Sequence, residues 1–259
     1  MSVGFRMRTP LLPDFPRPLV FAHRGLSVMH PENTMASYRA ARDASIPGIE
    51  LDVHLTKDGR LVVFHDDTTK RLTSDSVPDY RIEDSDYALL SSLDIGSWKG
   101  PSFAGERMPL LDEVLDEFGK TQYFDIEIKS RTVGDAGLEG KLADAIRRAG
   151  MGRRCIVSSF NPFALRRFKG LMPGLPTAII WSRSSELYWF LRRGEGRWIG
   201  AVDVLKPQQS LFRRKRLLAA LRRPLLPWTV DTEADAERVL SFGAAGIISN
   251  CPEQLSAWR

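Results

Sequence analysis

The segment that decides the fold reads Gly48-Ile49-Glu50-Leu51-Asp52-Val53-His54-Leu55-Thr56. Apolar and polar residues alternate through it, which is typical of an extended strand with one face in an apolar core. Successive side chains of a strand point to opposite faces, so Glu50, Asp52 and His54 share one face. The two carboxylates would lie about 7 Å apart along the backbone. That spacing suits a hard divalent cation, although Glu-x-Asp alone equally fits a solvated strand face.

Two apolar runs flank this strand, and each ends in a histidine. One reads Val20-Phe21-Ala22-His23-Arg24, and the other reads Leu61-Val62-Val63-Phe64-His65-Asp66. A single histidine at the end of an apolar run is more often a core residue, but here both have a charged neighbour. Sites in parallel α/β folds form at the carboxyl ends of strands. We therefore interpret His23 and His65 as proton-transfer candidates, with Arg24 placed to hold a phosphate.

Strands and helices alternate along the chain, which indicates a parallel sheet. We expect strands at 19–24, 48–55, 123–128, 155–159, 177–181, 201–205, 227–230 and 246–249, with an extra strand at 60–65. Helices are expected at 33–45, 110–118, 138–149, 162–169, 184–193, 211–222 and 233–242. Eight strands with intervening helices form a TIM (β/α)₈ barrel, for which 259 residues suffice.

Residues 67–108 interrupt this rhythm because they contain many Asp, Ser, Tyr and Gly residues and no long helical face. They predict a small insertion after the second strand region. We therefore expect an N-terminal extension at 1–18 and one barrel domain at 19–259 that includes the insertion.

Composition is that of an ordinary globular chain, with 43% hydrophobic and 27% charged residues. The longest apolar runs are strand-sized, well short of the roughly 20 residues of a membrane-spanning helix. The N-terminus shows no continuous apolar core or cleavage site, so we expect no signal peptide and a cytoplasmic location. Cys155 and Cys251 are isolated and are interpreted as buried reduced thiols.

The net charge of +5 raises the question of an anionic partner. The one basic cluster comprises residues 213–216 with Arg222 and Arg223, around leucines at helical spacing. It is interpreted as the solvated face of an amphipathic outer helix, with weak contact to anionic lipid headgroups as the alternative. No aromatic interleaving or recognition motif accompanies it, so no nucleic-acid partner is expected.

The order of the short motifs resembles the glycerophosphodiester phosphodiesterase family. The motifs are His-Arg-Gly at 23–25, Pro-Glu-Asn-Thr at 31–34, Glu-x-Asp at 50–52, Thr-Lys-Asp-Gly at 56–59 and Val-x-His-Asp at 63–66. Later matches are Ile-Glu-Ile-Lys at 126–129, Pro-Trp-Thr-Val at 227–230 and Gly-Ile-Ile-Ser-Asn at 246–250. The resemblance covers residues 19 to 258. It implies a barrel with a small cap over its mouth, which hydrolyses glycerophosphodiesters, substrates of lipid metabolism, to glycerol 3-phosphate and an alcohol.

The resemblance also assigns the metal ligands and the proton-transfer groups. It makes Glu127 the third metal carboxylate beside Glu50 and Asp52. Three neighbouring carboxylates repel one another without a cation, and their hard oxygens favour Mg²⁺ or Ca²⁺ over zinc. His23 and His65 are implied as general base and general acid, in an order that the sequence leaves open.

Five residues are implied to bind substrate: Arg24, Glu32, Asn33, Lys129 and Trp228. Arg24 and Lys129 would face phosphate oxygens, because a guanidinium and an ammonium both donate to them. Glu32 and Asn33 would line or brace the site at the start of the first helix. Trp228 would form a wall of the glycerol or headgroup pocket.

The chain departs from the family's pattern at its C-terminal end and in the insertion. Thr-Val-Asn usually follows the late tryptophan, and this chain has Asp231 in place of the asparagine. An aspartate is usual near the end of the last strand, where this chain has Asn250. The insertion lacks the usual Asn-Gly turn. Since loops at the mouth form the leaving-group pocket, these changes bear on leaving-group specificity.

Two other functions use the same residues. A lysophospholipase D or a sphingomyelinase-D-like enzyme would need an apolar groove, and the insertion supplies Tyr80, Tyr87, Leu89, Leu90, Trp98 and Phe103. A non-catalytic phosphate-binding barrel is disfavoured, because every expected ligand and both histidines are present.

Overall fold

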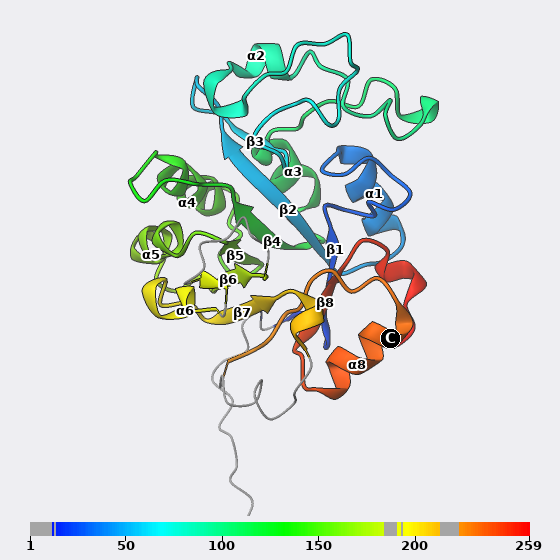
Figure 1. The fold of residues 1–259 in the computed structure, drawn as a ribbon, viewed down its shortest axis with the longest axis vertical. Coiled ribbons are helices and arrows are strands. Elements are labelled where there is room, and N and C mark those ends of the chain that lie inside the picture. The colour runs from blue at the N-terminus through cyan, green and yellow to red at the C-terminus, as the bar shows by residue number, and fades with distance from the viewer. Residues whose placement is uncertain (1–11, 13, 184–190, 193, 213–222) are drawn as a thin grey trace, which may run out of the picture.

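The computed structural model describes residue 12 and residues 14–183, 191–192, 194–212 and 223–259 (Figure 1). Its centre is a curled sheet in the order β7-β6-β5-β4-β2-β1-β8, in which all neighbours pair in parallel. The strands are β1 (Leu19–His23), β2 (Gly48–Leu55), β4 (Tyr123–Ile128), β5 (Cys155–Ser159), β6 (Thr177–Trp181), β7 (Val204–Pro207) and β8 (Gly246–Ser249).

Residues 224–230, which precede α8 in the chain, lie between β7 and β8 in the barrel. On one side, the Leu226 amide donates to the carbonyl of Leu205 on β7 (2.8 Å). On the other, the Ile248 amide donates to the carbonyl of Pro227 (3.0 Å), and the Val230 amide donates to the carbonyl of Ile248 (2.9 Å). This segment forms only isolated bridges and not the strand expected at 227–230, but it occupies the eighth strand position, so the TIM-barrel fold expected from the sequence is confirmed.

The helices cover the outside of the barrel (Figure 1). They are α1 (Met35–Asp43), α3 (Leu111–Phe118), α4 (Leu138–Arg148), α5 (Pro162–Leu171), the short α6 (Gly196–Ile199) and α8 (Glu233–Ser241). Thr34 begins α1 because its side chain accepts a hydrogen bond from the Ser37 amide. The helices expected at 184–193 and 211–222, with most of the basic cluster, lie almost wholly outside the described residues.

The strand expected at 201–205 is displaced and begins at Val204. Ala201 adopts a left-handed backbone with φ 49°, which interrupts an extended run at that point. The strand instead continues through Lys206, whose side chain is buried despite its charge. A polar residue in this position suggests a strand end, and that is why the sequence-based prediction was wrong here.

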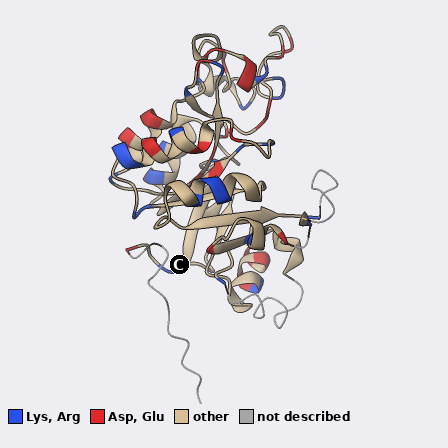
Figure 2. Cartoon of the chain, turned by 90° about the vertical axis from the view of Figure 1, so that its left-hand side faces the viewer, with Lys and Arg blue, Asp and Glu red and all other residues tan. Residues whose placement is uncertain are grey.

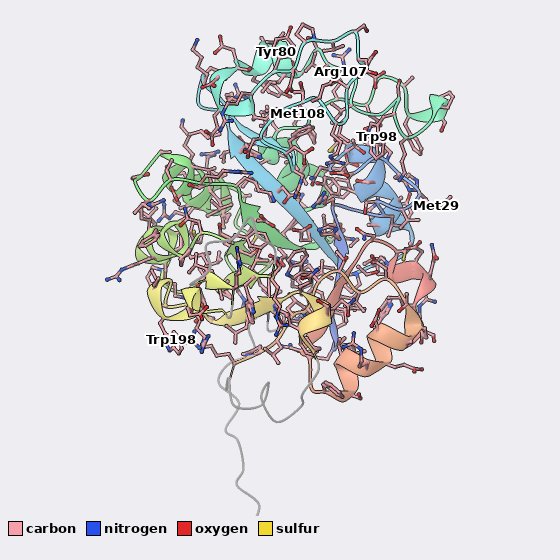
Figure 3. The ribbon with its side chains drawn as sticks, viewed as in Figure 1. Met29, Tyr80, Trp98, Arg107, Met108 and Trp198 are labelled. Atoms are coloured by element: carbon pink, nitrogen blue, oxygen red, sulfur yellow. The ribbon has the colours of Figure 1, made fainter. Side chains whose placement is uncertain are left out.

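Residues 67–108, called the cap from here on, sit at one end of the barrel (Figure 1). They contain only short helices, η1 (Ile82–Asp84), α2 (Tyr87–Leu90) and η2 (Pro101–Phe103), as the lack of a helical face predicted. The cap has its own apolar cluster, which includes Leu72, Ile82, Leu90, Ile95 and Met108. Figure 3 labels Tyr80, Trp98 and Met108 in this region. Strand β3 (Leu61–Val63) pairs antiparallel with β2 and leads into the cap.

The opposite end of the barrel is filled by apolar side chains. Leu12 and Phe15 pack there with Phe21, Tyr123 and Ile248. On the side seen in Figure 2, basic and acidic residues are interspersed over the outer helices.

Among the residues that the structure describes, no helix has the length and apolar character needed to cross a bilayer.

Candidate active site

Three carboxylates meet where β2 and β4 lie side by side. The parallel register pairs Asp52 with Glu127. One oxygen from each of Glu50, Asp52 and Glu127 lies within 4.8 Å of the others, and all three residues are buried. The strand alternation read from the sequence thus brings these side chains to one face. Clustered oxygen ligands of this kind fit a hard divalent cation.

The charge of this acidic cluster is only partly compensated. Burial and the neighbouring charge of Asp52 raise the pKa of Glu50 well above its usual range. Burial alone would also raise the pKa of Asp52, but the Lys129 ammonium at 2.9 Å, with Arg24, holds that pKa well below its usual range. Lys129 lies 2.6 Å from Glu127 as well. A carboxyl that is hard to ionise beside two paired carboxylates is the environment that a bound cation would relieve.

His23 lies beside the acidic cluster at the end of β1. Its Nδ1 is 2.7 Å from Oδ1 of Asn250, and its Nε2 is 3.8 Å from Oε2 of Glu50. Burial and the adjacent charge of Arg24 lower the pKa of His23 to about 3. The imidazole is therefore neutral near pH 7, as a proton acceptor must be.

His65 is backed directly by a carboxylate. Its Nδ1 lies 2.6 Å from Oδ1 of Asp66, so Nδ1 carries a proton and Nε2 remains available for chemistry. His65 lies within electrostatic reach of both His23 and Asp52. The structure therefore brings together the two histidines that the sequence singled out, with different partners on their Nδ1 atoms.

Arg24 contacts two carboxylates of the acidic cluster, and also Glu32. Its backbone adopts φ 56°, and its amide donates to Oε2 of Glu50 (3.1 Å). Its Nε lies 3.3 Å from Oδ2 of Asp52, and its NH1 group donates to Glu32 (2.9 Å). The guanidinium is thus held at the edge of the acidic cluster.

Asn33 is fully buried, and both ends of its amide are occupied. Its Nδ2 donates to Oδ2 of Asp52 (2.8 Å), and its Oδ1 accepts from the Tyr38 hydroxyl (2.8 Å). This placement makes Asn33 a brace for the Asp52 carboxylate.

Arg71, from the cap, was missed by the sequence analysis. Its guanidinium donates two hydrogen bonds to Glu32 (2.9 and 2.7 Å) and two to Asp66 (2.6 and 3.2 Å). One side chain thus connects the carboxylate that holds Arg24 with the carboxylate that holds His65. No local pattern around residue 71 marked it, because both partners are set by the fold.

Trp228 and Phe160 lie together on another side of the barrel. Their rings meet edge to face, with centroids 5.7 Å apart. The indole Nε1 of Trp228 donates to the carbonyl of Lys206 (2.9 Å), which fixes the ring. Both side chains are partly exposed, so their apolar faces are available to a ligand.

A buried ion pair lies within the barrel and was not predicted. The ammonium of Lys206 is 2.7 Å from Oδ2 of Asp125 and donates to the Ser158 hydroxyl (2.9 Å). Lys206 is 1% exposed and Asp125 is fully buried. Since Asp125 neighbours Glu50 across the sheet, the lysine also moderates the negative charge beneath the acidic cluster.

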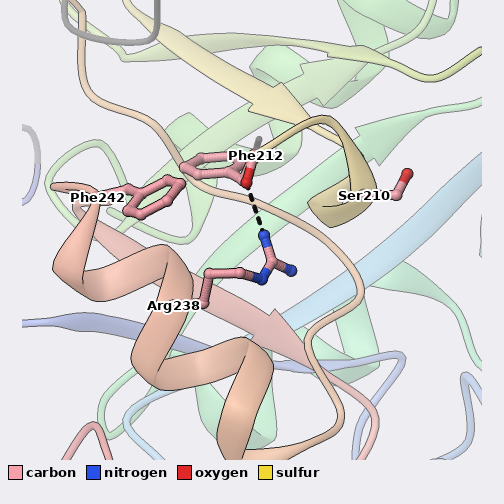
Figure 4. A pocket seen from close by; sticks show the side chains of 4 residues that line it. All are labelled: Ser210, Phe212, Arg238 and Phe242. Carbon is pink, nitrogen blue, oxygen red and sulfur yellow. Dashed lines mark hydrogen bonds between the residues drawn. The ribbon is translucent and has the colours of Figure 1, made fainter. Parts of the chain in front are cut away.

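A surface cavity of about 390 Å³ lies between η4 (Gln209–Leu211) and α8 (Figure 4). It is lined by Ser210, Phe212, Arg238 and Phe242. Arg238 already donates to the carbonyl of Phe212 (2.8 Å). Neither a histidine nor a carboxylate is among its lining residues, so this cavity lacks the groups that gather at the acidic cluster.

Comparison with known proteins agrees with this geometry. Residues 23–254 match the model of the glycerophosphoryl diester phosphodiesterase family. A glycerophosphodiester phosphodiesterase of Caldanaerobacter subterraneus is 37% identical, over 92% of this chain and 96% of that protein. One of Bacillus subtilis is 33% identical, over 94% and 86% respectively.

A solved structure shares the fold as well. It is an Oleispira antarctica phosphodiesterase in complex with the product sn-glycerol-3-phosphate, with a TM-score of 0.76 and 29% identity. The match covers 92% of this chain and 95% of that one. The family match over most of the sequence and the shared barrel lead to one conclusion: the chain belongs to the glycerophosphoryl diester phosphodiesterase family.

Proposed function

We propose that this enzyme hydrolyses glycerophosphodiesters to glycerol 3-phosphate and an alcohol, with one divalent cation, Mg²⁺ or Ca²⁺. The observation that carries the proposal is the cluster of Glu50, Asp52 and Glu127, whose oxygens lie within 4.8 Å of one another beside two histidines. Phosphodiesterase activity follows from the family, and the proposal adds the metal, the mechanism and the residues.

The three carboxylates would hold the cation, since all the candidate ligands are oxygens. When bound, a divalent cation offsets the negative charge that develops on the phosphoryl oxygens. We place Arg24 and Lys129 against the same oxygens, because both cationic side chains border the acidic cluster. Glu32 and Asn33 act through their neighbours, by holding Arg24 and Asp52 in place.

The two histidines would move the protons. One takes the proton of the glycerol hydroxyl beside the phosphate, and that oxygen forms a bond to phosphorus. The other protonates the alcohol oxygen as its bond to phosphorus breaks. Water then opens the cyclic phosphate with the histidine roles reversed. The sum is diester plus water giving glycerol 3-phosphate plus alcohol.

Trp228 and Phe160 would wall the pocket for the glycerol or the headgroup, because their partly exposed rings lie together. The division into an extension at 1–18 and one barrel at 19–259, like the cytoplasmic location, stays a prediction.

A substrate panel tests the function. Glycerophosphocholine, glycerophosphoethanolamine, glycerophosphoglycerol and a lysophospholipid would be incubated with EDTA, Mg²⁺ or Ca²⁺, and released glycerol 3-phosphate measured. We expect cation-dependent release from at least one small diester. Cleavage of the lysophospholipid alone would instead favour the hypothesis that the protein is a lysophospholipase D. Binding without turnover under every condition would favour a phosphate-binding barrel.

Arg71→Met is expected to lower kcat/KM by about 10- to 100-fold, the usual effect of losing a partner that orients catalytic groups. The change frees Glu32 and Asp66 together, so Arg24 and His65 both lose support. Arg71→Lys should recover only part of the loss, because an ammonium lacks the planar fork.

The matched control is Arg39→Met. Arg39 donates two hydrogen bonds to Glu117 (both 2.7 Å) and is similarly exposed, but it lies outside the site. Steady-state kinetics should show little change for this variant. Equal kcat/KM for wild type and Arg71→Met would refute the bridging role.

A further inference from the structure

We propose that Asp231 is a positioning residue that orients the Asn250 amide and thereby sets which nitrogen of His23 carries the proton. The proposal rests on the proposed function in one respect, that His23 transfers a proton. It adds two residues beyond the metal ligands and the two histidines: Asp231, just before α8, and Asn250, just after β8.

The Asp231 carboxylate is held by three donors. Its Oδ1 accepts from the backbone amide of Asn250 (2.8 Å) and from the Ser249 hydroxyl (3.1 Å). Its Oδ2 accepts from Nδ2 of Asn250 (2.7 Å). The first two hydrogen bonds hold the Asp231 carboxylate in place. Its Oδ2 therefore accepts from the Asn250 side-chain amide at a fixed position.

The amide of Asn250 has only one favourable orientation in this setting. Its Oδ1 accepts from the Ser27 hydroxyl (3.0 Å) and faces Nδ1 of His23 (2.7 Å). A reversed amide would set its oxygen against Oδ2 of Asp231, and an ionised carboxylate has no proton to donate. The carboxylate therefore directs the amide oxygen toward His23.

The tautomer of His23 follows. An amide oxygen only accepts, so Nδ1 of His23 must carry the hydrogen, and the neutral ring keeps its lone pair on Nε2. That atom lies 3.8 Å from Oε2 of Glu50, on the side of the acidic cluster. The arrangement presents an unprotonated nitrogen where substrate would bind, which is the state required to accept a proton.

The direct test is nitrogen NMR of the histidine rings. The chain has only four histidines, so long-range proton–nitrogen spectra of ¹⁵N-histidine-labelled protein are tractable. The signals that vanish in His23→Gln identify this residue. We expect wild-type His23 to show a protonated Nδ1 and an unprotonated Nε2 near neutral pH, with and without Mg²⁺. The opposite tautomer would overturn the proposal, whether or not the enzyme turns over any tested substrate.

Variants test the role of Asp231. In Asp231→Asn the carboxylate no longer dictates the amide orientation, so we expect the Nε2–H tautomer to appear and kcat to fall by about 10- to 100-fold, with KM changed little. Asn250→Asp alone would set two carboxylates in contact and should also reduce kcat.

The exchange of both residues, Asp231→Asn with Asn250→Asp, separates positioning from simple loss of structure. The amide introduced at position 231 could then donate to the carboxylate introduced at position 250, whose other oxygen would still accept from Nδ1 of His23. We expect the wild-type tautomer and most of kcat to return. Asp235→Asn, at the start of α8, is the control for loss of a carboxylate and should leave both readouts unchanged. An unchanged tautomer in Asp231→Asn, or no recovery in the exchange, would overturn the proposal.

Discussion

His23→Ala and His65→Ala are each expected to lower kcat by about 10²- to 10⁴-fold, the usual contribution of a positioned general acid or base. Each imidazole is oriented through its Nδ1, His23 by Asn250 (2.7 Å) and His65 by Asp66 (2.6 Å), so each offers Nε2. Truncation removes this group but leaves the carboxylates in place, and KM should therefore change little. Steady-state kinetics at saturating cation on the best substrate of the panel measures the effect.

The double variant adds a sharper expectation. If both histidines act in the same step, the loss in His23→Ala/His65→Ala should be far smaller than the product of the two single losses. His30→Ala is the control for removing an imidazole, since His30 packs against Phe103 in the cap and is not part of the acidic cluster. Retention of most activity in both single variants would contradict the assignment of these histidines as general acid and base.

Removal of the divalent cation is expected to abolish turnover, and its return should restore it. The same event should be visible in stability, because a ligand that binds only the folded state stabilises it by about 2.7 kcal/mol at one hundred times its Kd. Melting curves of the inactive His23→Ala variant, with EDTA and then with Mg²⁺ or Ca²⁺, measure this without turnover. We expect a rise in Tm with at least one cation.

Glu50→Gln is expected to raise the Tm of the metal-free protein and to remove the rise in Tm that a cation causes. Burial beside Asp52 raises the pKa of Glu50, so ionising this carboxyl costs stability in the metal-free protein. The amide removes that cost, and the metal-free Tm should rise. The cation-induced rise should vanish, because one ligand has lost its charge. Glu117→Gln, on the exposed face of α3, should leave the cation response intact. A wild-type Tm that does not change when Mg²⁺ or Ca²⁺ is added would contradict the metal site.

The parts of the site that lie on strands were predictable from the sequence, because strand geometry is local. Alternation places Glu50 and Asp52 on one face of β2, and parallel pairing then brings Glu127 of β4 beside Asp52. Buried apolar residues on the other face of each strand make the pattern strong. The histidines were visible for the same reason, since each follows an apolar run.

The supporting contacts were not predictable, because they join elements far apart in the chain. Arg71 reaches Glu32 from the cap, and Asp231 reaches Asn250 from the segment before α8. Nothing in the residues next to Arg71 or Asp231 specifies these partners. The continuation of β7 through Lys206 has a related cause, because the charge of this lysine has a partner only in the folded barrel.

The buried pair of Lys206 and Asp125 has an evolutionary consequence. Removing one member of a buried ion pair leaves an uncompensated charge in the interior and costs several kcal/mol, whereas replacing both with neutral residues is often tolerated. Selection should therefore remove single substitutions at either position. Viable sequences should keep the charged pair or replace both residues together. Among relatives, residues 125 and 206 are expected to covary: those that lose the lysine should also lose the aspartate.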